Sequence, residues 1–312
     1  MKPKKIFLTN LILLSILLAV VTTVRYYNRK RPLISPIPNI TQIVSAWEQD
    51  DKPLWSPQEQ PANLETDCLK ILAQSALVID RNTNQVLYAK NAHQPFPIAS
   101  LTKIMTALVA LETAPLNTKM IVSYQAAQIG EATMNLDEKE KLTLEELLYG
   151  LMLVSGNDAA TTIAENIAGR VSLFVNLMNE KANQLNLEHT KFYNPHGLDQ
   201  NNSPPNQSTA YELAILSYYT LDKFPQLEKI ATTDNIIIKA NENHKEYSLN
   251  NLLGLERTYP GLFGLKPGYT SMAGYCLVGM ARGKKNEVLV VLLNSSNLKE
   301  DLTKLLDYWL EK

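Results

Sequence analysis

A serine and a lysine three residues apart, Ser100 and Lys103, are the first residues whose types and spacing could do chemistry. They lie near the start of residues 97–112, in which apolar side chains recur at helical spacing on more than one face. In such a helix the two side chains lie one turn apart on the same side, at its N-terminal end. A neutral lysine placed there could take the hydroxyl proton and make the serine a nucleophile. The spacing also fits a capped helix with a surface lysine, because Ser296 and Lys299 repeat it before the last predicted helix, where the serine or the residue after it suits the N-cap.

Two further stretches place polar side chains where they could join this pair. Residues 154–160, VSGNDAA, break two apolar helical patterns and put Ser155 and Asn157 on a short connection. Residues 264–270, GLKPGYT, form a strand pattern with Lys266 and with a glycine that permits close approach to its backbone. Taken singly, the first stretch also fits helix capping, and the second fits a strand that begins at a turn.

Other catalytic arrangements find little support in the sequence. The four histidines, His93, His189, His196 and His244, lack the i, i+4 or H-x-H spacing of a metal site. The G-x-S-x-G stretch of a Ser-His-Asp hydrolase is missing as well. For His196, in NPHGLD at residues 194–199, we expect a hydrogen bond that orders its loop. The sequence therefore favours a serine activated by lysine, with no metal and no other cofactor.

The predicted elements suggest how these residues are positioned, because strands occur at both ends of the domain and helices between them. The predicted strands cover residues 76–80, 85–88, 236–239, 264–270, 274–282 and 288–293. The predicted helices cover residues 97–112, 143–154, 159–168, 171–185, 209–221 and 298–310. We therefore predict an α+β fold, with one antiparallel sheet flanked by helices and an all-helical lobe inserted in the middle of the chain.

The first 65 residues differ in character from the rest. After the first lysines comes an uncharged apolar run of nineteen residues, long enough at helical rise to cross a bilayer core. Without a small-x-small cleavage site, an uncleaved anchor over residues 1–24 is favoured over a cleavable signal. Prolines are expected to interrupt any helix or ladder in residues 25–65, which predicts a semi-extended linker. Its tryptophans, Trp47 and Trp55, are expected to dock on the folded domain, residues 66–312.

Charge and cysteine content narrow the function further. The formal net charge of -1 gives no sign of a nucleic-acid partner. Two cysteines cannot form a disulfide framework. Cys276 lies in an apolar strand pattern and is expected to be a buried small residue, and a single bridge to Cys68 is left open.

Three stretches resemble motifs of penicillin-binding proteins and serine β-lactamases, and they occur in the same order. Residues 100–103 resemble S-x-x-K, residues 155–157 resemble S-x-N, and residues 266–268 resemble K-T-G. Longer matches make the chain similar to the D-alanyl-D-alanine carboxypeptidases, the low-molecular-mass penicillin-binding proteins. These are PIASLTKIMTA at residues 97–107, LLYGLMLVSGNDAA at 147–160, FYNPHGL at 192–198, STA at 208–210 and GLKPGYTSMAGYCLV at 264–278. The resemblance covers residues 72–294 and implies the penicillin-binding, β-lactamase-like transpeptidase fold.

The resemblance implies catalytic roles for three residues. Ser100 would attack the carbonyl between the two terminal D-alanines of a peptidoglycan stem peptide, giving an acyl-enzyme that water hydrolyses. Lys103 would be its base, with a pKa lowered by apolar surroundings, by the helix N-terminus and by the Lys266 cation. Ser155, beside Asn157, would pass a proton to the leaving amine, and Asn157 would also hold the substrate peptide.

The same resemblance implies a substrate-binding strand. Lys266 would attract the terminal carboxylate of the substrate. The backbone N–H groups of Ser100 and Tyr269 would form the oxyanion hole, in which one donor typically contributes about 3 to 4 kcal/mol. Gly268 and Thr270 would complete the binding surface on either side of Tyr269.

Two positions depart from the family pattern. Pro267 stands where the family carries threonine or serine, so a hydroxyl expected to bind the substrate carboxylate is missing. A hydrogen bond of this kind to a charged group contributes about 1.5 to 3 kcal/mol. The proline deletes no ladder bond if its strand edge faces the substrate. Beyond the last strand the family's usual arginine is replaced by Lys299 alone, a point charge. We also expect no C-terminal β-domain.

We therefore predict a serine D-alanyl-D-alanine carboxypeptidase of peptidoglycan and cell-wall biogenesis that removes the terminal D-alanine from stem pentapeptides. The expected partners are peptidoglycan stem peptides, β-lactams as covalent inhibitors and the cytoplasmic membrane, with no nucleic acid. We expect a single-pass protein of the cell membrane with its catalytic domain outside the cytoplasm. Three alternatives stay open: a DD-endopeptidase, a β-lactamase-like hydrolase, superficially suggested by E-x-x-L-N at residues 246–250, and a catalytically weak penicillin-binding scaffold, suggested by Pro267.

Overall fold

The computed structural model describes residues 40–47, 55–58, 69–201, 203–253, 259–284 and 286–310. All of them belong to one compact unit, Ile40–Lys312, and the separate unit Met1–Asn39 lies outside the description. The predicted division into an anchor, a linker and a catalytic domain beginning at residue 66 stays a prediction.

The helices of the described structure contradict the predicted localisation. No helix within the described ranges is long and apolar enough to cross a membrane. The structure therefore does not support a single-pass membrane protein with an extracytoplasmic catalytic domain. The segment on which that prediction rested, residues 1–24, lies outside the described residues.

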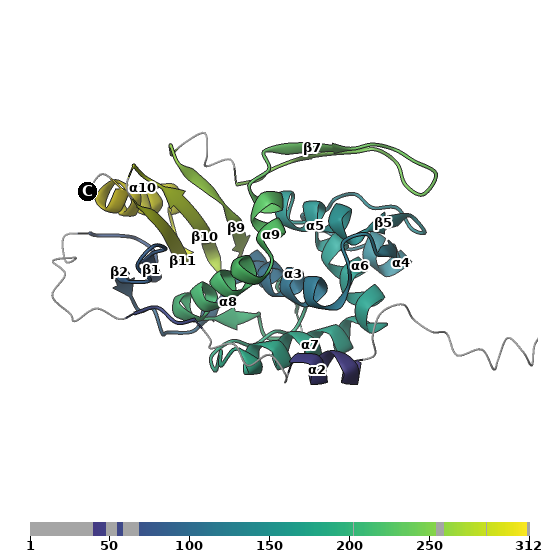
Figure 1. Cartoon of the computed structure of the whole chain (residues 1–312), viewed down its shortest axis with the longest axis horizontal. Coiled ribbons are helices and arrows are strands. Elements are labelled where there is room, and N and C mark those ends of the chain that lie inside the picture. Colours follow the sequence, from purple (N-terminus) through teal and green to yellow (C-terminus); the bar gives the residue numbers. More distant parts are fainter. Residues whose placement is uncertain are drawn as a thin grey trace, which may run out of the picture. The chain divides into compact units, whose positions relative to one another are not determined.

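A five-stranded antiparallel sheet is the largest sheet of the described structure (Figure 1). Its strands are β1 (Ser75–Asp80), β2 (Val86–Lys90), β9 (Leu262–Thr270), β10 (Gly274–Arg282) and β11 (Glu287–Ser295). They lie in the order β2-β1-β11-β10-β9, so that β9 forms one edge and every neighbouring pair is antiparallel. The prediction of an antiparallel sheet built from both ends of the chain is confirmed, although the strand predicted at residues 236–239 belongs to a separate two-stranded sheet.

Helices pack on the two faces of this sheet. The C-terminal helix α10 (Leu298–Leu310) contacts β10 and β11, and its buried leucines share a core with alternate residues of β1, β10 and β11. Helix α8 (Ala210–Lys223) contacts β1, β10 and β11 from the side of the helical lobe (Figure 1). The side chains of a strand alternate between its faces, so the apolar strands can bury residues against both helices.

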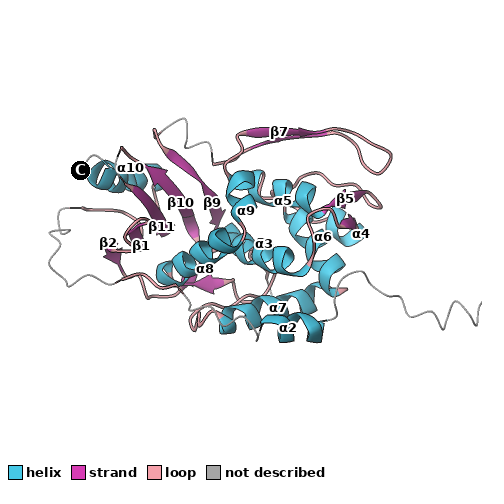
Figure 2. Ribbon diagram, in the orientation of Figure 1, coloured by secondary structure: helices cyan, strands magenta, loops and turns pink. Residues whose placement is uncertain are grey.

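The inserted lobe is helical, as predicted (Figure 2). Its main helices are α3 (Thr102–Thr113), which follows the 3-10 turn η1 (Ala99–Leu101), α5 (Leu144–Leu153), α6 (Asn157–Ala168) and α7 (Val171–Gln184). Helix α3 contacts α5, α6, α7 and α8, and nearly all of its residues are buried. It therefore crosses the interior, which explains its apolar residues on more than one face.

Local signals fix two of these helix boundaries. Thr143 caps α5 in a capping box, in which its hydroxyl accepts from the Glu146 N–H and the Glu146 carboxylate accepts from the Thr143 N–H. Gly169 ends α6 with a φ of 75°, a left-handed conformation that glycine adopts without steric cost. The start of α5 lies within one residue of the predicted start at residue 143, and α6 ends at the predicted residue 168.

Most of the remaining elements are short and were not predicted. They are the paired strands β3 (Phe96–Pro97) and β6 (Gln207–Ser208), β4 (Lys119–Ile121) and β5 (Lys141–Thr143), the strand β8 (Tyr247–Asn250), and the helices α4 (Tyr124–Ala127) and α9 (Pro225–Ala231). Strand β8 pairs with the predicted β7 (Asn235–Ile238). Segments of two to seven residues are too short for a hydrophobic period to identify them.

The expectation that prolines exclude a helix from residues 25–65 is wrong for residues 40–47, which form helix α2 (Ile40–Trp47). This stretch contains no proline, so nothing in it blocks helical hydrogen bonds. Helix α2 packs on α7. The Lys181 ammonium lies 4.0 Å above the ring of Trp47 and 2.6 Å from the buried Glu112 carboxylate.

Both tryptophans of the predicted linker dock on the folded unit, as expected. Trp47 is buried, and its carbonyl accepts a hydrogen bond from the Gln184 side chain. Trp55 stacks on Tyr218 of α8 with ring centroids 4.0 Å apart and planes 8° apart. At residue 58 the backbone of Gln58 bonds to the β1–β2 hairpin. The described parts of this segment therefore belong to the folded unit.

Candidate active site

Ser100 lies in η1 at the start of α3, next to backbone held in an uncommon conformation. Ala99 has a φ of 45°, in the left-handed region that residues with a side chain seldom adopt. Gly197, with a φ of 89°, packs so closely that a Cβ built on it would lie 2.0 Å from the Ala99 carbonyl oxygen. No residue with a side chain fits there. Strained backbone held by its surroundings in this way is common at functional sites.

The amine of Lys103 is fully buried and contacts three acceptors. Its Nζ lies 3.0 Å from Ser100 Oγ, 2.8 Å from Asn157 Oδ1 and 2.6 Å from the His196 carbonyl oxygen. Burial lowers the pKa of Lys103 well below its ordinary value, and the Lys266 cation lowers it further. A neutral amine has two N–H donors and one lone pair. Asn157 and the His196 carbonyl can accept from the two donors, which directs the lone pair toward the Ser100 hydroxyl.

Ser155 and Asn157 reach the same place from the connection between α5 and α6. The Ser155 hydroxyl donates to Ser100 Oγ at 3.0 Å, and Ser155 itself has a φ of 58°. The Asn157 carboxamide accepts from Lys103 and donates to the Gly130 carbonyl at 3.1 Å, so both of its ends are fixed. The structure thus brings together the two polar pairs that the sequence singled out.

The edge strand β9 supplies the opposite side of the site. Lys266 is fully buried, and burial lowers its pKa to about 7. A Cβ built on Gly268 would lie 2.8 Å from the Ser100 backbone nitrogen, so only glycine lets the strand approach the nucleophile this closely. The next residue, Tyr269, has its side chain exposed.

Thr270 forms a hydrogen bond with Asp199, a residue to which the sequence analysis assigned no role. Its hydroxyl donates to Asp199 Oδ1 at 3.1 Å and accepts from the Ala273 N–H, while the other Asp199 oxygen accepts from the Met272 N–H. Asp199 therefore holds the β9–β10 turn against the loop at residues 194–199.

The carbonyl of His196 is the main feature that sequence reasoning missed. Every residue has a backbone carbonyl, so residue types alone cannot predict which carbonyl will accept a hydrogen bond from Lys103. Behind it, Asn206 donates to Thr102 Oγ1 and to the Asn194 carbonyl, both at 2.9 Å, and so ties the loop to α3. The His196 ring accepts from the Leu198 N–H, as the expected loop-ordering bond requires. Burial, followed by the charge of Lys103, lowers the pKa of His196 to about 3 and keeps it neutral.

The structure also places the residues that depart from the family pattern or whose role the sequence left open. Pro267 is on the edge strand β9, opposite Leu277 of β10. Lys299 is exposed in the first turn of α10, the helix of the second S-x-x-K match. Glu246 is exposed just before β8, which pairs with β7 in a separate sheet. Cys276 is a buried free thiol, and burial raises its pKa to about 12, while Cys68 lies outside the described residues.

Comparison with known proteins shows the family to which this chain belongs. A family model described as D-alanyl-D-alanine carboxypeptidase matches residues 59–297, more than half of the chain. The chain belongs to the D-alanyl-D-alanine carboxypeptidase family. It is 36% identical to the D-alanyl-D-alanine carboxypeptidase DacF of Bacillus subtilis (strain 168) over 244 residues, which are 76% of this chain and 61% of that relative. The chain therefore spans less than two thirds of that relative's length.

Solved structures of the carboxypeptidase family share the fold. The crystal structure of D-alanyl-D-alanine carboxypeptidase from Mycobacterium tuberculosis H37Rv superposes with a TM-score of 0.70 and 28% identity, over 77% of this chain and 91% of that one. Penicillin-binding protein D2 from Listeria monocytogenes in its ampicillin-bound form gives a TM-score of 0.66 and 26% identity, over 77% and 98%. The predicted penicillin-binding transpeptidase fold is confirmed.

Proposed function

We propose that this chain is a serine D-alanyl-D-alanine carboxypeptidase that releases the terminal D-alanine from peptidoglycan stem pentapeptides. The observation that carries the proposal is the environment of Lys103: a buried amine 3.0 Å from the Ser100 hydroxyl, with two fixed acceptors for its own N–H groups. This arrangement suits a neutral base and serves no evident purpose in a core that could hold an apolar side chain instead.

Acylation begins when the Ser100 oxygen attacks the carbonyl of the penultimate D-alanine. Its proton passes to Lys103, and the negative oxygen of the tetrahedral intermediate accepts from the N–H groups of Ser100 and Tyr269. Ser155 then gives its hydroxyl proton to the departing amine and is reprotonated from Lys103. The C–N bond breaks, D-alanine leaves, and the peptide stays esterified to Ser100.

Deacylation returns the enzyme to its starting state. Water attacks the ester carbonyl while Lys103, neutral again, takes a proton from it, and the proton then goes to the Ser100 oxygen as the ester bond breaks. The same two donors stabilise the second tetrahedral intermediate. The products are the shortened peptide and the free serine, so no cofactor takes part in the balance.

Substrate binding would favour the neutral form of Lys103, the proposed base. The terminal carboxylate lies beside Lys266, whose pKa burial lowers to about 7 in the free enzyme. A bound carboxylate favours the charged form of Lys266, and that charge disfavours protonation of Lys103. The neutral Lys103 is therefore most populated when substrate is present. Asn157 would hold the peptide backbone, with Gly268 and Thr270 on the facing strand.

The same nucleophile accounts for β-lactams as covalent inhibitors. A β-lactam presents a strained amide carbonyl and a nearby carboxylate, the two groups for which Ser100 and Lys266 are placed. The structural relative from Listeria monocytogenes with bound ampicillin supports this part of the proposal.

The test is mass spectrometry of purified muropeptides incubated with the full chain. Loss of one alanine from pentapeptides, absent in Ser100→Ala, would support the carboxypeptidase. Cleavage of cross-linked dimers with intact pentapeptides would instead indicate an endopeptidase. Rapid turnover of a chromogenic cephalosporin would indicate a β-lactamase. Absence of both peptide cleavage and a fluorescent penicillin adduct on Ser100 would favour a scaffold and refute the proposal.

A further inference from the structure

A loop that contacts Asn157 has no part in the mechanism above. Residues 130–136, between α4 and β5, form neither helix nor strand. Glu131 and Asn135 have φ values of 63° and 62°, a left-handed conformation that residues with a side chain seldom adopt. The loop therefore depends on contacts with the rest of the helical lobe to keep its backbone in this conformation.

Asn157 holds the first half of this loop. Its backbone N–H donates to the Ala132 carbonyl at 2.8 Å, and its side-chain Nδ2 donates to the Gly130 carbonyl at 3.1 Å. A carbonyl can only accept, so the carboxamide must turn its NH₂ group toward Gly130 and its oxygen toward Lys103. The loop thus decides which end of the Asn157 carboxamide faces the proposed base.

The orientation of that carboxamide matters for the base. Lys103 Nζ donates to the Asn157 oxygen at 2.8 Å, which leaves the lone pair of a neutral amine free to face the Ser100 hydroxyl. A carboxamide turned end for end would present its NH₂ group to Lys103 and would donate to that lone pair instead. The amine could then no longer accept the serine proton, although every catalytic side chain would still be present.

Asp158 holds the second half of the loop. It is 1% exposed and lies in the first turn of α6. Its Oδ1 accepts from the Met134 N–H at 2.9 Å, and its Oδ2 accepts from the Leu136 N–H at 3.0 Å. Oδ1 also accepts from the Ala159 N–H of its own helix. Two consecutive residues of α6, Asn157 and Asp158, therefore hold the loop at four backbone groups.

The charge of Asp158 requires an explanation, because it works against the base. Burial and the Lys266 cation lower the pKa of Lys103, whereas the Asp158 carboxylate raises it. A neutral amine would be easier to maintain without a buried carboxylate nearby. The hydrogen bonds to the loop supply the explanation, because a carboxylate has two acceptor oxygens, whereas the carboxamide of asparagine, of similar size, has one.

We propose that Asp158 is a positioning residue for the reaction, which fixes the loop at residues 130–136 and, through the Gly130 carbonyl, the orientation of the Asn157 carboxamide. The inference rests on the proposed function, in which Asn157 helps to direct the Lys103 lone pair toward Ser100. Asp158 acts through Asn157 rather than by contact with the substrate.

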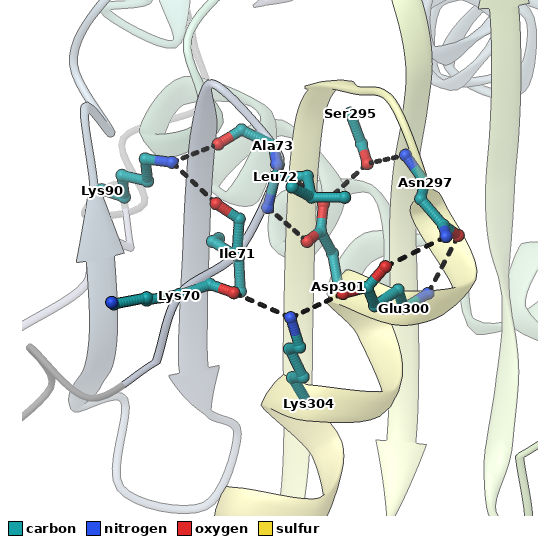
Figure 3. Close-up of polar contacts among 10 residues, drawn as sticks. All are labelled: Lys70, Ile71, Leu72, Ala73, Lys90, Ser295, Asn297, Glu300, Asp301 and Lys304. Carbon is teal, nitrogen blue, oxygen red and sulfur yellow. Dashed lines mark hydrogen bonds and ion pairs between the residues drawn. The ribbon is translucent and has the colours of Figure 1, made fainter.

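The test compares Asp158→Asn with Asp301→Asn in the full chain. Asparagine replaces one carboxylate oxygen by an NH₂ group, so one N–H group of the loop loses its acceptor. Asp301 is the matched control, because it is also buried, lies in the first turn of α10 and accepts from three donors, two of them backbone N–H groups (Figure 3). Both variants should lose thermal stability, but only Asp158→Asn should affect the site.

The first readout is hydrogen exchange of the Asn157 side-chain amide, whose NMR signal is assigned by its absence in Asn157→Ala. In the native chain we expect this NH₂ group and the Met134 and Leu136 amides to share similar protection, because one opening of the loop exposes them all. Asp301→Asn should keep this protection, and Asp158→Asn should lower it by about tenfold or more.

Two exchange results would overturn the proposal. One is native protection of the Asn157 side chain in Asp158→Asn. The other needs no variant to fold: free exchange of the Met134 and Leu136 amides in the native chain while the Asn157 side chain stays protected.

The second readout is acylation of Ser100 by a fluorescent penicillin. We expect Asp158→Asn to slow acylation roughly 10- to 100-fold, since small misplacements of catalytic groups are costly. In the Asn157→Ala background it should cause no further loss, because the two residues act as one unit. Equal losses in both backgrounds would show a merely structural role and overturn the proposal.

The outcomes separate this inference from the proposed function. Absence of both acylation and peptide hydrolysis in the native chain would refute the proposed function. The exchange measurement would still decide whether Asp158 fixes the Asn157 carboxamide.

Discussion

The helical side and the strand side of the site differ in how far their polar groups are already paired. On the helical side, Lys103, Ser155 and Asn157 form a connected set of hydrogen bonds that includes the Ser100 hydroxyl. On the strand side, Lys266 donates to its neighbour's carbonyl, and Pro267 offers no hydroxyl where the family has one. The first set is complete without a ligand, whereas in the proposed function the second is completed by the substrate carboxylate.

This difference separates activation of the nucleophile from recognition of the substrate. Changes on the helical side should lower the rate of acylation, because they act on the groups that we propose to move protons. Changes on the strand side should alter KM or its pH dependence, because they act on the proposed partner of the terminal carboxylate.

The largest effect is expected for Lys103→Met. Methionine fills the buried space without a base, so acylation of Ser100 by a fluorescent penicillin should slow by roughly 10⁴-fold or more in a rapid-mixing experiment. The matched control is Lys181→Met, which removes the other fully buried lysine of the helical lobe, away from the site. It should lower stability and leave acylation unchanged. Acylation within tenfold of the native rate in Lys103→Met would break the assignment of the base.

Ser155→Ala should have the next largest effect. It removes the 3.0 Å hydrogen bond to Ser100 and the proposed proton donor to the leaving amine. We expect kcat for D-alanine release to fall by about 10² to 10⁴ with little change in KM. Ser123→Ala, which removes the cap of α4, serves as the control. An unchanged kcat would exclude Ser155 from the proton path.

On the strand side, titration of Lys266 should appear in the pH profile of kcat/KM. Because burial lowers the pKa of Lys266 to about 7, the free enzyme loses this positive charge as the pH rises through neutrality. We expect kcat/KM to fall above about pH 7, approaching tenfold per pH unit, while the acid limb reflects protonation of Lys103. Lys266→Arg keeps the charge and should abolish the alkaline limb. A native profile that still rises at pH 9 would contradict this assignment.

A change remote from both sides should have the smallest effect on activity. Trp47→Ala uncovers the buried Lys181–Glu112 pair and removes the ring that lies over Lys181 of α7. We expect the free energy of unfolding to fall by about 2 to 4 kcal/mol and kcat/KM to stay within twofold. Thermal unfolding of the full chain provides the measurement, and a large loss of activity without loss of stability would link this segment to the site.

The sequence predicted the parts of the site that depend on residue type within a short stretch. Ser100 with Lys103, and Ser155 with Asn157, each lie within one turn or connection, so spacing alone places their side chains near each other. The order of strands and helices likewise predicted the sheet and the inserted lobe. These features are local, or they repeat with a period that a sequence shows directly.

The rest depended on contacts that only the fold creates. The His196 carbonyl has no signature in the sequence, and neither does the support that Asn206 gives to its loop. Helix α2 was missed because the prolines around it dominate the composition of the segment, although none lies within it. The pair between Lys181 and Glu112 joins residues far apart in the chain, so neither residue predicts the other.

The most direct test of this account is a comparison of kcat and KM for the native chain and Pro267→Thr on a D-alanyl-D-alanine pentapeptide. Restoring the hydroxyl should lower KM by roughly ten- to a hundredfold, since a hydrogen bond to a charged group contributes about 1.5 to 3 kcal/mol, and should leave kcat nearly unchanged. The gain should vanish with a substrate whose terminal carboxylate is amidated. A rise in kcat at constant KM would contradict the account, because it would place the deficiency on the side of Ser100 and Lys103.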